Sequence, residues 1–448
     1  MEFSRAGGVK KNRHSCMSRR WGLLALVFVG ILISYVDRGN LSIAAESIMR
    51  DFRLTPASMG VLLSAFFWTY ALFQIPAGLM VDKFGIRVVY ASGFLIWSLA
   101  SAGMALSRGP GDIFGLRLVL GLAESVGPLA SLAFIRQNFE GPAQGLPVSI
   151  YIAGQTIGPA CGALLGSTLL ADFGWRAMFA ATGLGALLWV PFWAHFAPKR
   201  QMVKPLANAS GSEGANAIRW PWRSILTSPS FWAMSASVFF FSYYWYFVLT
   251  WMPAYLTISR GYSTIGMGRI LSVPLFAMAV VNVLAGFLAD RLIAARGALF
   301  RIRLIFLSLG LVGASAILLL NFIPGHAPVL PVLIISVCSF GVASSSFWAI
   351  AQYTSPSVMV GRAIGYLNTI SQIGGVSAPL ITGWSLGPHK DFRLAILLAG
   401  ISPLISVVLL FLAGPKGLGK LKSDLGSASG FQTGLLTRAV QQGLPNRD

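Results

Sequence analysis

Four charged residues lie inside long apolar stretches of the sequence, where a charge is costly. The stretch 113–134 carries Arg117 and Glu124, and an earlier stretch carries Asp37 and Arg38. A charged side chain near the middle of a bilayer costs about 2.5–3.5 kcal/mol even on insertion scales, so such residues usually line a protein interior or a water-filled path. Structural ion pairs inside a helix bundle would give the same pattern. The presence of two separate acid–base pairs favours a functional interpretation.

The spacing of these residues predicts how they are placed. Arg117 and Glu124 are seven residues apart, so they project from one helix face about 10 Å apart along the axis. Pro128 weakens the helix one turn later. Asp37 and Arg38 point about 100° apart, so neither can neutralise the other head-on. We expect the four side chains to converge on one polar cavity, where a guanidinium group is a natural receptor for a carboxylate ligand.

The composition indicates a membrane protein with many spans. Hydrophobic residues make up 55% of the 448 residues, charged residues make up 11%, and the mean hydropathy is +0.70. A soluble chain of this composition could not cover its surface with polar groups. The apolar runs are continuous, which favours helices over the alternating pattern of a membrane barrel. Twelve such runs, in two sets of six, lie near residues 21–43, 58–80, 88–107, 112–134, 145–168, 176–197, 230–255, 267–289, 302–323, 328–350, 362–384 and 393–414.

The net charge of +20 is explained by membrane topology. Most of the 34 Lys and Arg residues fall on the side of the twelve spans that holds both termini. The positive-inside rule therefore predicts that both termini are cytoplasmic, with the basic residues facing anionic lipid. No basic motif interleaved with aromatic residues points to nucleic acid. The first apolar run contains Asp37 and lacks a small-residue cleavage site, so we expect an uncleaved span and not a signal peptide.

Cysteine and histidine argue against an enzyme or a metal protein. Cys16 lies in the basic N-terminal segment, Cys161 and Cys338 lie in predicted spans, and the four His residues fall in that segment or near span ends. None of these spacings suits a metal site or a disulfide framework. The sequence shows no Ser/His/Asp set and no Gly-rich phosphate loop. We therefore expect no metal, no catalytic residue and no enzyme activity.

A ten-residue segment at 78–87, Gly-Leu-Met-Val-Asp-Lys-Phe-Gly-Ile-Arg, predicts a cytoplasmic turn between the second and third spans. Its second glycine permits a tight backbone, and its basic residues can anchor at lipid headgroups. The segment resembles the G-x-x-x-D-R/K-x-G-x-R/K signature of the major facilitator superfamily. A weaker copy at 286–296 follows the eighth span, where an internal duplication would place it. The resemblance implies a gating role for Asp82, Lys83 and Arg87.

Across residues 21–414 the chain resembles the anion:cation symporter branch of that superfamily. The resemblance is carried by YVDRGNLSIA at 35–44, by the Arg-x6-Glu pattern with GLAES in the fourth span, and by FVLTWMPAYL at 247–256. It implies the major facilitator fold, an all-α membrane protein with twelve transmembrane helices in two pseudo-symmetric six-helix bundles. It also implies a monomeric carrier of the bacterial inner membrane, similar to symporters for sugar acids such as galactonate, glucarate and hexuronates.

The same resemblance implies roles for individual residues. Asp37 and Glu124 would bind protons, and Arg38 and Arg117 would hold carboxylates. Protons would be the coupling ion, with no other cofactor. Six further positions are expected to line the substrate cavity: Tyr35, Tyr70, Gln155, Ser345, Trp348 and Asn368.

The expected organisation is two bundles joined by a polar linker. The segments are a basic cytoplasmic tail at 1–20, the first bundle at 21–198, a cytoplasmic linker at 199–228, the second bundle at 229–414 and a disordered cytoplasmic tail at 415–448.

The predicted function is proton-coupled symport of a small organic anion by alternating access, with the two bundles rocking around a central site. Protons would neutralise the carboxylates and so free the guanidinium groups for the carboxylate of the substrate. A uniporter or exchanger of another carboxylate, including a small aromatic acid, stays open, as do a drug effluxer and a transport-dead sensor. The aromatic cluster at 243–247 could form a wall of the site or simply pack. Trp251 and Tyr255 are expected in an aromatic belt at the outer membrane edge.

Overall fold

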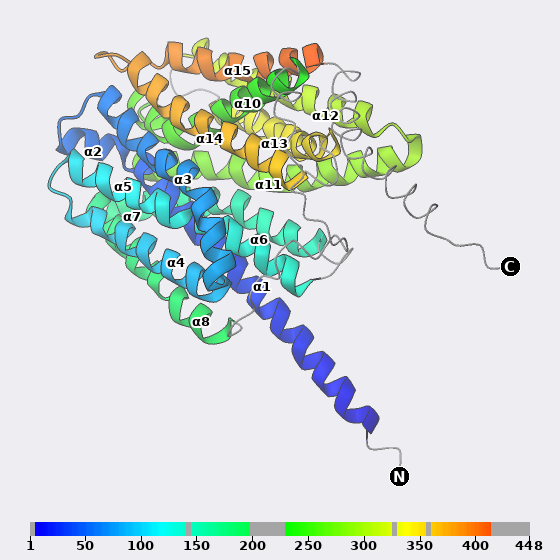
Figure 1. The fold of residues 1–448 in the computed structure, drawn as a ribbon. Helices are drawn as coiled ribbons and strands as arrows, with labels where there is room; N and C mark the ends of the chain where they lie inside the picture. The colour runs from blue at the N-terminus through cyan, green and yellow to red at the C-terminus, as the bar shows by residue number, and fades with distance from the viewer. Residues whose placement is uncertain (1–4, 140–144, 198–228, 325–328, 355–359, 414–448) are drawn as a thin grey trace.

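Helices form all of the regular secondary structure in the part of the chain that the computed structural model describes, residues 5–139, 145–197, 229–324, 329–354 and 360–413. The predicted all-α fold is confirmed, and Figure 1 shows its two halves lying side by side. The first half contains α1 (Arg5–Ile43), α2 (Ala45–Asp51), α3 (Pro56–Phe84), α4 (Ile86–Gly103), η1 (Met104–Leu106), α5 (Pro110–Glu124), α6 (Val126–Asn138), α7 (Gly145–Leu187) and α8 (Trp189–Phe196). The second half contains α10 (Pro229–Ala254), the π-helical η4 (Tyr255–Ser259), α11 (Thr264–Arg296), α12 (Leu299–Ala314), η5 (Ser315–Asn321), α13 (Val329–Thr354), α14 (Val360–Ser385) and α15 (Arg393–Ala413).

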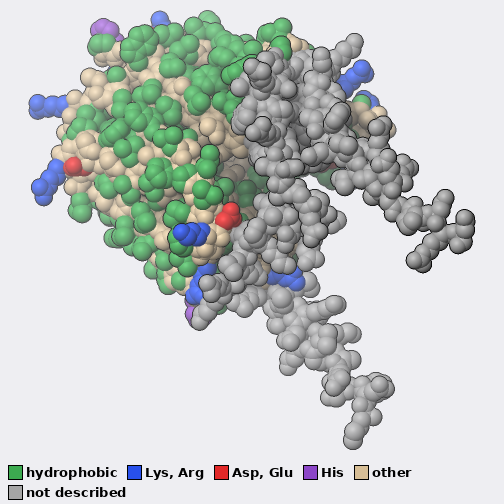
Figure 2. Space-filling model, in the orientation of Figure 1, with side chains coloured by type: hydrophobic (Ala, Val, Ile, Leu, Met, Phe, Trp, Pro, Cys, Tyr) green, Lys and Arg blue, Asp and Glu red, His purple; other side chains and the backbone are tan. Residues whose placement is uncertain are grey.

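Nine helical segments within the described ranges are long and apolar enough to cross a membrane. One of them, 146–196, contains both the fifth and the sixth predicted spans, and α10 and α14 cover the seventh and the eleventh. The helices therefore account for all twelve predicted spans. In the coloured part of the face seen in Figure 2, hydrophobic side chains are spread widely and few charged side chains lie among them. Such an exterior matches the hydrocarbon interior of a bilayer.

The ends of the two halves are only partly described. The first span and the described part of the predicted N-terminal tail form one continuous helix, α1, which begins at Arg5. In Figure 1 the N-terminal part of this helix projects beyond the bundle. The predicted linker at 199–228 and the predicted C-terminal tail at 415–448 lie outside the described residues.

Glycine and proline set the breaks between the spans. Gly85 joins α3 to α4 with a φ of 83°, and Gly174 kinks α7 between the fifth and sixth spans with a φ of 81°. Residues that carry a Cβ rarely adopt such a positive φ. The fourth span is divided at Ser125, because Pro128 cannot donate to the carbonyl four residues earlier and its ring crowds that group. The break leaves Glu124 as the last residue of α5.

The two halves meet through α3 against α14 and through α7 against α11. The backbones are so close that a Cβ on Gly60 would lie 2.5 Å from the Pro379 carbonyl oxygen, and a Cβ on Gly383 would meet the α3 backbone at the same distance. A Cβ on Gly268 would lie 2.6 Å from the Ala163 carbonyl oxygen. These contacts lie near the ends of the helices that are expected to face outward. The halves are therefore closed against each other at that end.

Two aromatic residues of the second half are placed differently from the sequence-based expectation. Trp251 and Tyr255 were expected to face lipid in an aromatic belt, but their side chains are completely buried. Trp251 Nε1 donates to the Pro379 carbonyl at 3.1 Å, and the Tyr255 hydroxyl accepts from Arg260 Nε at 2.5 Å. The belt prediction was wrong because the side of α10 that carries these residues packs within the protein.

Gly60→Val should separate α3 from α14, because the added atoms would overlap the backbone of the opposite helix. Spin labels on the exposed positions Ser58 and Trp384 should then report a longer distance than in the parent protein. Gly115→Val is the matched control, since a Cβ there meets nothing within 4 Å. Equal label distances in the two variants would show that the close approach at Gly60 does not hold the halves together.

Candidate functional site

A buried ion pair between α1 and α5 forms the centre of the site. Arg38 Nη2 donates to Glu124 Oε2 at 2.8 Å, and the same carboxylate oxygen accepts a hydrogen bond from the Ser34 hydroxyl at 2.9 Å. The Glu124 side chain is fully buried and the Arg38 side chain is 9% exposed. Glu124 Oε1 has no hydrogen-bond partner among the described residues. A buried pair whose groups are only partly hydrogen-bonded is held less firmly than a fully satisfied one.

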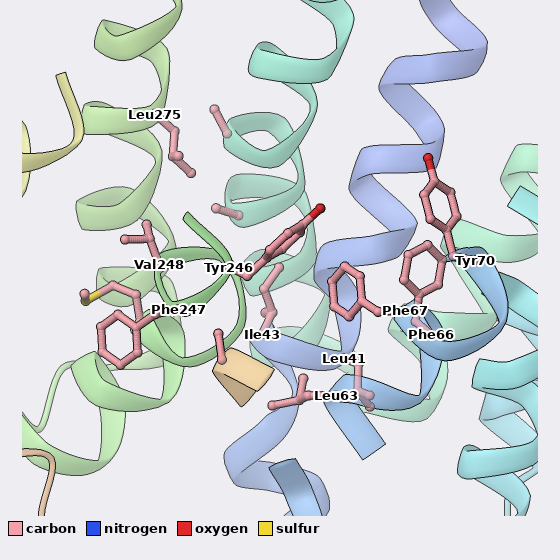
Figure 3. Close-up of a cluster of buried hydrophobic side chains, with 14 of the residues drawn as sticks. Leu41, Ile43, Leu63, Phe66, Phe67, Tyr70, Tyr246, Phe247, Val248 and Leu275 are labelled. Atoms are coloured by element: carbon pink, nitrogen blue, oxygen red, sulfur yellow. The ribbon is translucent and has the colours of Figure 1, made fainter. Parts of the chain in front are cut away.

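Aromatic rings of α1 and α3 surround the Arg38 guanidinium group. Its central carbon lies 4.6 Å from the centres of the Tyr35 and Phe66 rings and 4.9 Å from that of Tyr70. Phe66 also faces the second cation, since the Arg117 guanidinium carbon lies 5.2 Å from its ring centre. Figure 3 shows Phe66 and Tyr70 projecting from α3. The faces of aromatic rings attract cations, so these rings stabilise two buried guanidinium groups.

Arg117 is a buried cation with no carboxylate partner among the described residues. Its only hydrogen bond there is a long one, 3.5 Å from Nη2 to the Leu63 carbonyl, and its Nε and Nη1 have none. Arg117 and Glu124 lie on the same helix, α5, as expected, but they do not pair with each other, because Arg38 of α1 reaches the carboxylate instead. A buried guanidinium group without a counterion is a strong receptor for an anion.

A pocket of about 540 Å³, including its solvent-open part, adjoins both arginines and lies between the two halves. The lining residues come from α1, α3, α5 and α7 of the first half and from α10 and α11 of the second. They are Tyr35, Arg38, Gly39, Ser42, Ile43, Phe67, Arg117, Pro159, Ala163, Leu249, Thr250, Pro253, Leu271 and Leu275.

Asp37 faces a different environment from the other three charges. Its Oδ1 accepts from the Ser101 hydroxyl at 3.3 Å and from Asn40 Nδ2 at 3.4 Å, and Asn40 also donates to the Thr182 hydroxyl at 2.9 Å. Asp37 Oδ2 has no partner among the described residues. These groups lie inside the first half, between α1, α4 and α7, and Asp37 does not line the pocket. The expectation that all four charges converge on one cavity therefore holds only for the two arginines. Glu124 reaches the pocket through its ion pair with Arg38, and Asp37 does not reach it.

The other predicted cavity residues are dispersed. Gln155 donates to the Tyr151 hydroxyl of its own helix at 2.9 Å, and Asn368 donates to Gln74 of α3 at 3.0 Å, which links the two halves. The Ser345 hydroxyl donates to a carbonyl of its own helix, and Trp348 packs edge-on against Phe347. Of the six predicted cavity residues, Tyr35 lines the pocket described above. Tyr70 lies against Arg38 but does not line the pocket, and neither do Gln155, Ser345, Trp348 and Asn368.

The predicted gating turn lies at the end of α3. Asp82 and Lys83 are exposed, with the Lys83 ammonium group 5.2 Å from the centre of the Phe84 ring. Arg87 donates to the Ala194 carbonyl of α8 and so fastens the turn to its own half. In the weaker second copy, Arg303 of α12 pairs with Asp290 of α11.

Sequence reasoning did not single out three residues that support the charges. Ser34 donates to Glu124, Phe66 faces both guanidinium groups, and Ser101 donates to Asp37. Ser34 carried a usable signal, since it lies four residues before Arg38 and therefore on the same helix face. Phe66 and Ser101 are ordinary residues of apolar spans, and only the packing of α3 and α4 against α1 brings them to the site. Within the described residues, no group of three or more His, Cys, Asp or Glu side chains could hold a metal ion.

The helical fold, the membrane-spanning segments and the charged pocket between two halves define a membrane protein of the transporter type. The chain belongs to the Major Facilitator Superfamily, whose family profile matches residues 27–379.

Several curated relatives match most of the chain. A probable galactarate/D-glucarate transporter of Bacillus subtilis is 26% identical over 89% of this chain and 92% of its own length. A D-galactonate transporter of Escherichia coli is 27% identical over 82% of this chain and 89% of its own length, and a hexuronate transporter of Bacillus subtilis is 26% identical over 84% and 90%. Among solved structures, a bacterial homologue of the human lysosomal transporter Spinster, inward-facing and unoccupied, superimposes with a TM-score of 0.71 at 17% identity, covering 92% of this chain and 98% of its own. That likeness shows the shared fold.

Ser34→Ala should destabilise the protein by removing one of the two donors to Glu124 Oε2. Hydrogen bonds to charged groups contribute about 1.5–3 kcal/mol, so we expect a loss of that order in the free energy of unfolding. The measurement is reversible denaturation in mixed micelles. Ser64→Ala is the matched control, since Ser64 is also buried and its hydroxyl donates to the Val61 carbonyl of its own helix, not to a charged group. A loss no greater than in the control would mean that Ser34 does not stabilise the carboxylate.

Proposed function

We propose that the protein is a proton-coupled symporter of a small organic carboxylate. The observation that carries the proposal is the buried Arg38–Glu124 pair beside the unpaired Arg117 at a pocket between the two halves. The names of the sugar-acid transporters among its relatives support an organic anion as the substrate. We further propose that the protein lies in a bacterial inner membrane as a monomer with both termini in the cytoplasm.

The coupling follows from competition for the guanidinium groups. While Glu124 is ionised, it occupies Arg38, and only Arg117 is available to an anion. A proton on Glu124 removes the charge that holds Arg38, so both cations can then bind the carboxylate of the substrate. Proton and substrate thus favour each other's binding. Asp37 is a second candidate proton site, set apart in its own group of hydroxyl and amide partners.

Alternating access supplies the movement. The halves touch at the expected outer end through glycines of α3, α11 and α14, which fits a state whose site opens toward the other side of the membrane. Rocking of one half against the other around the pocket would expose the site to each side in turn. Asp82, Lys83 and Arg87 lie at the expected cytoplasmic end of α3 and α4, where they would act when that end closes.

Glu124→Gln should uncouple transport without abolishing it. Glutamine is nearly the same size but cannot release a proton, so it imitates the protonated carboxylate in every state. Exchange of substrate between equal pools should survive in proteoliposomes, while uptake driven by a proton gradient should collapse. Glu46→Gln, in the first half but outside the site, should keep both activities.

The two remaining outcomes would each revise the mechanism. Loss of both exchange and gradient-driven uptake in folded Glu124→Gln protein would make Glu124 a structural partner of Arg38. Full gradient-driven uptake would move the coupling role to Asp37.

Arg38→Lys should be nearly as damaging as Arg38→Ala. An ammonium group cannot present the planar fork that binds a carboxylate through two hydrogen bonds, nor stack on the Tyr35, Phe66 and Tyr70 rings as a guanidinium group does. We expect substrate affinity to fall at least about tenfold in both variants, equivalent to about 1.4 kcal/mol. Near-normal affinity in the lysine variant would mean that Arg38 contributes only its charge.

A further inference from the structure

One aromatic ring of the first half lies in a socket that belongs to the second half. Phe67 of α3 is 2% exposed, and its ring lies in the socket formed by Gly375 of α14 and Tyr246 of α10. We propose that Phe67 is a gate that closes the arginine site toward the expected outer side, and that its ring leaves the socket each time the halves open there. This inference rests on the alternating access of the proposed function and names the residue that closes its site.

Gly375 leaves just enough room for the ring. A Cβ on this glycine would lie 2.7 Å from Cδ1 and 3.0 Å from Cε1 of Phe67, closer than carbon atoms normally approach. The neighbouring Gly374 has a different role, since a Cβ there would meet Ser242 and Phe239 of α10, within the second half. Of two adjacent glycines, one therefore packs α14 on its own half and the other receives a ring of the opposite half.

Tyr246 forms the other side of the socket. Its ring centre lies 4.6 Å from that of Phe67 in an edge-to-face contact, a favourable geometry for two aromatic rings. The Tyr246 hydroxyl donates to Gln372 at 3.0 Å, one helical turn before Gly375 on α14. Trp245, the preceding residue, instead stacks on a ring of α13. The socket is therefore held together within the second half, while the ring that fills it comes from the first.

Phe67 lies between the outer contact of the halves and the charged site. It is seven residues, about two helical turns, along α3 from Gly60, where the backbones of α3 and α14 meet at the expected outer end. The Phe66 ring, which faces both guanidinium groups, is centred 5.1 Å from the Phe67 ring. Figure 3 shows Phe67 between Phe66 and Tyr246, and Phe67 also lines the pocket. The ring is therefore a second closure, next to the charges.

The contact cannot persist through the proposed transport cycle. Rocking separates α3 from α14 at the outer end, so a ring carried by α3 must leave a socket made by α10 and α14. Burial of an aromatic ring favours the state in which it is buried. Loss of the ring, or of the room for it, is therefore expected to shift the protein toward the state that is open at the outer end.

The test measures this opening in the purified full-length protein in lipid nanodiscs. Spin labels on Ser58→Cys and Trp384→Cys, in a background whose three native cysteines are replaced by serine, report the ratio of long to short distances across the outer end. We expect Phe67→Ala and Gly375→Ala each to raise this ratio by about tenfold, because the first removes the ring and the second blocks its socket.

A double variant distinguishes a ring fitted to its socket from two unrelated changes. Once the ring is absent, a methyl group at position 375 has nothing to displace, so Phe67→Ala/Gly375→Ala should open no further than Phe67→Ala alone. Gly374→Ala is the matched control, because a Cβ there meets only α10 of its own half. Its effect on the ratio should be the same with and without the Phe67 ring.

Reagent access supplies the second measurement. Thr250 lines the pocket and is 5% exposed, so Thr250→Cys should react slowly with a membrane-impermeant maleimide added outside spheroplasts. Phe67→Ala and Gly375→Ala should each speed this reaction by about tenfold. Ser58→Cys, exposed near the start of α3, should react at the same rate in every background.

Three results would contradict the inference. Parental distances and reaction rates in folded Phe67→Ala and Gly375→Ala, with opening still seen in Gly60→Val, would overturn the gate and leave alternating access intact. No opening in any of the three variants would overturn the gate together with the movement that the proposed function requires. If the effects of Phe67→Ala and Gly375→Ala add in the double variant, the ring is not fitted to Gly375 and the inference fails.

Discussion

The site depends on one constraint, the cost of keeping charges away from water inside a bundle of apolar helices. Glu124 and Arg38 meet this constraint by pairing with each other at 2.8 Å, and Ser34 adds a second donor to the carboxylate. Within the described residues Arg117 has no such partner, and the Phe66 ring lies 5.2 Å from its guanidinium carbon. Among the described residues, the cluster of Arg38, Arg117 and Glu124 therefore holds one more cation than carboxylate. An incoming anion relieves that imbalance, and a proton on Glu124 increases it.

The helices around the pair position it through backbone features more than through side-chain contacts. Pro128 divides the fourth span and leaves Glu124 at the end of α5, next to α1. Glycines bring α3 against α14 and α7 against α11, so the two halves close at one end while the pocket lies between them. The proposed movement of the halves would change this close packing, and it would also change how much water reaches the ion pair.

Much of the fold could be predicted from the sequence, because length and hydropathy largely determine a membrane helix. The twelve runs, the turn at Gly85 and the interruption near Pro128 all follow from local chemistry. The four buried charges were found in the same way, since a charge in an apolar run is conspicuous. What local patterns do not contain is the rotation of one helix against its neighbours.

The site differs from the sequence-based expectation because the sequence does not show which face of each helix packs against its neighbours. Glu124 pairs with Arg38 of another helix and not with Arg117 of its own span, and Asp37 faces Ser101 of α4 instead of the pocket. The sequence also did not show that Leu271 and Leu275 line the pocket, because they look like any lipid-facing leucines. Trp251 was assigned to the membrane edge by its position along the helix, although its side of α10 is buried.

The proposed coupling requires that a proton on Glu124 and a substrate carboxylate on Arg38 bind together and so separate the Arg38–Glu124 ion pair. The most direct test is calorimetric titration of the purified protein with a carboxylate that it binds, repeated over a series of pH values. Titrations in two buffers with different ionisation enthalpies give the number of protons taken up on binding. The account predicts uptake of close to one proton per ligand in the parent protein and none in Glu124→Gln. Binding with no proton uptake by the parent protein would contradict it.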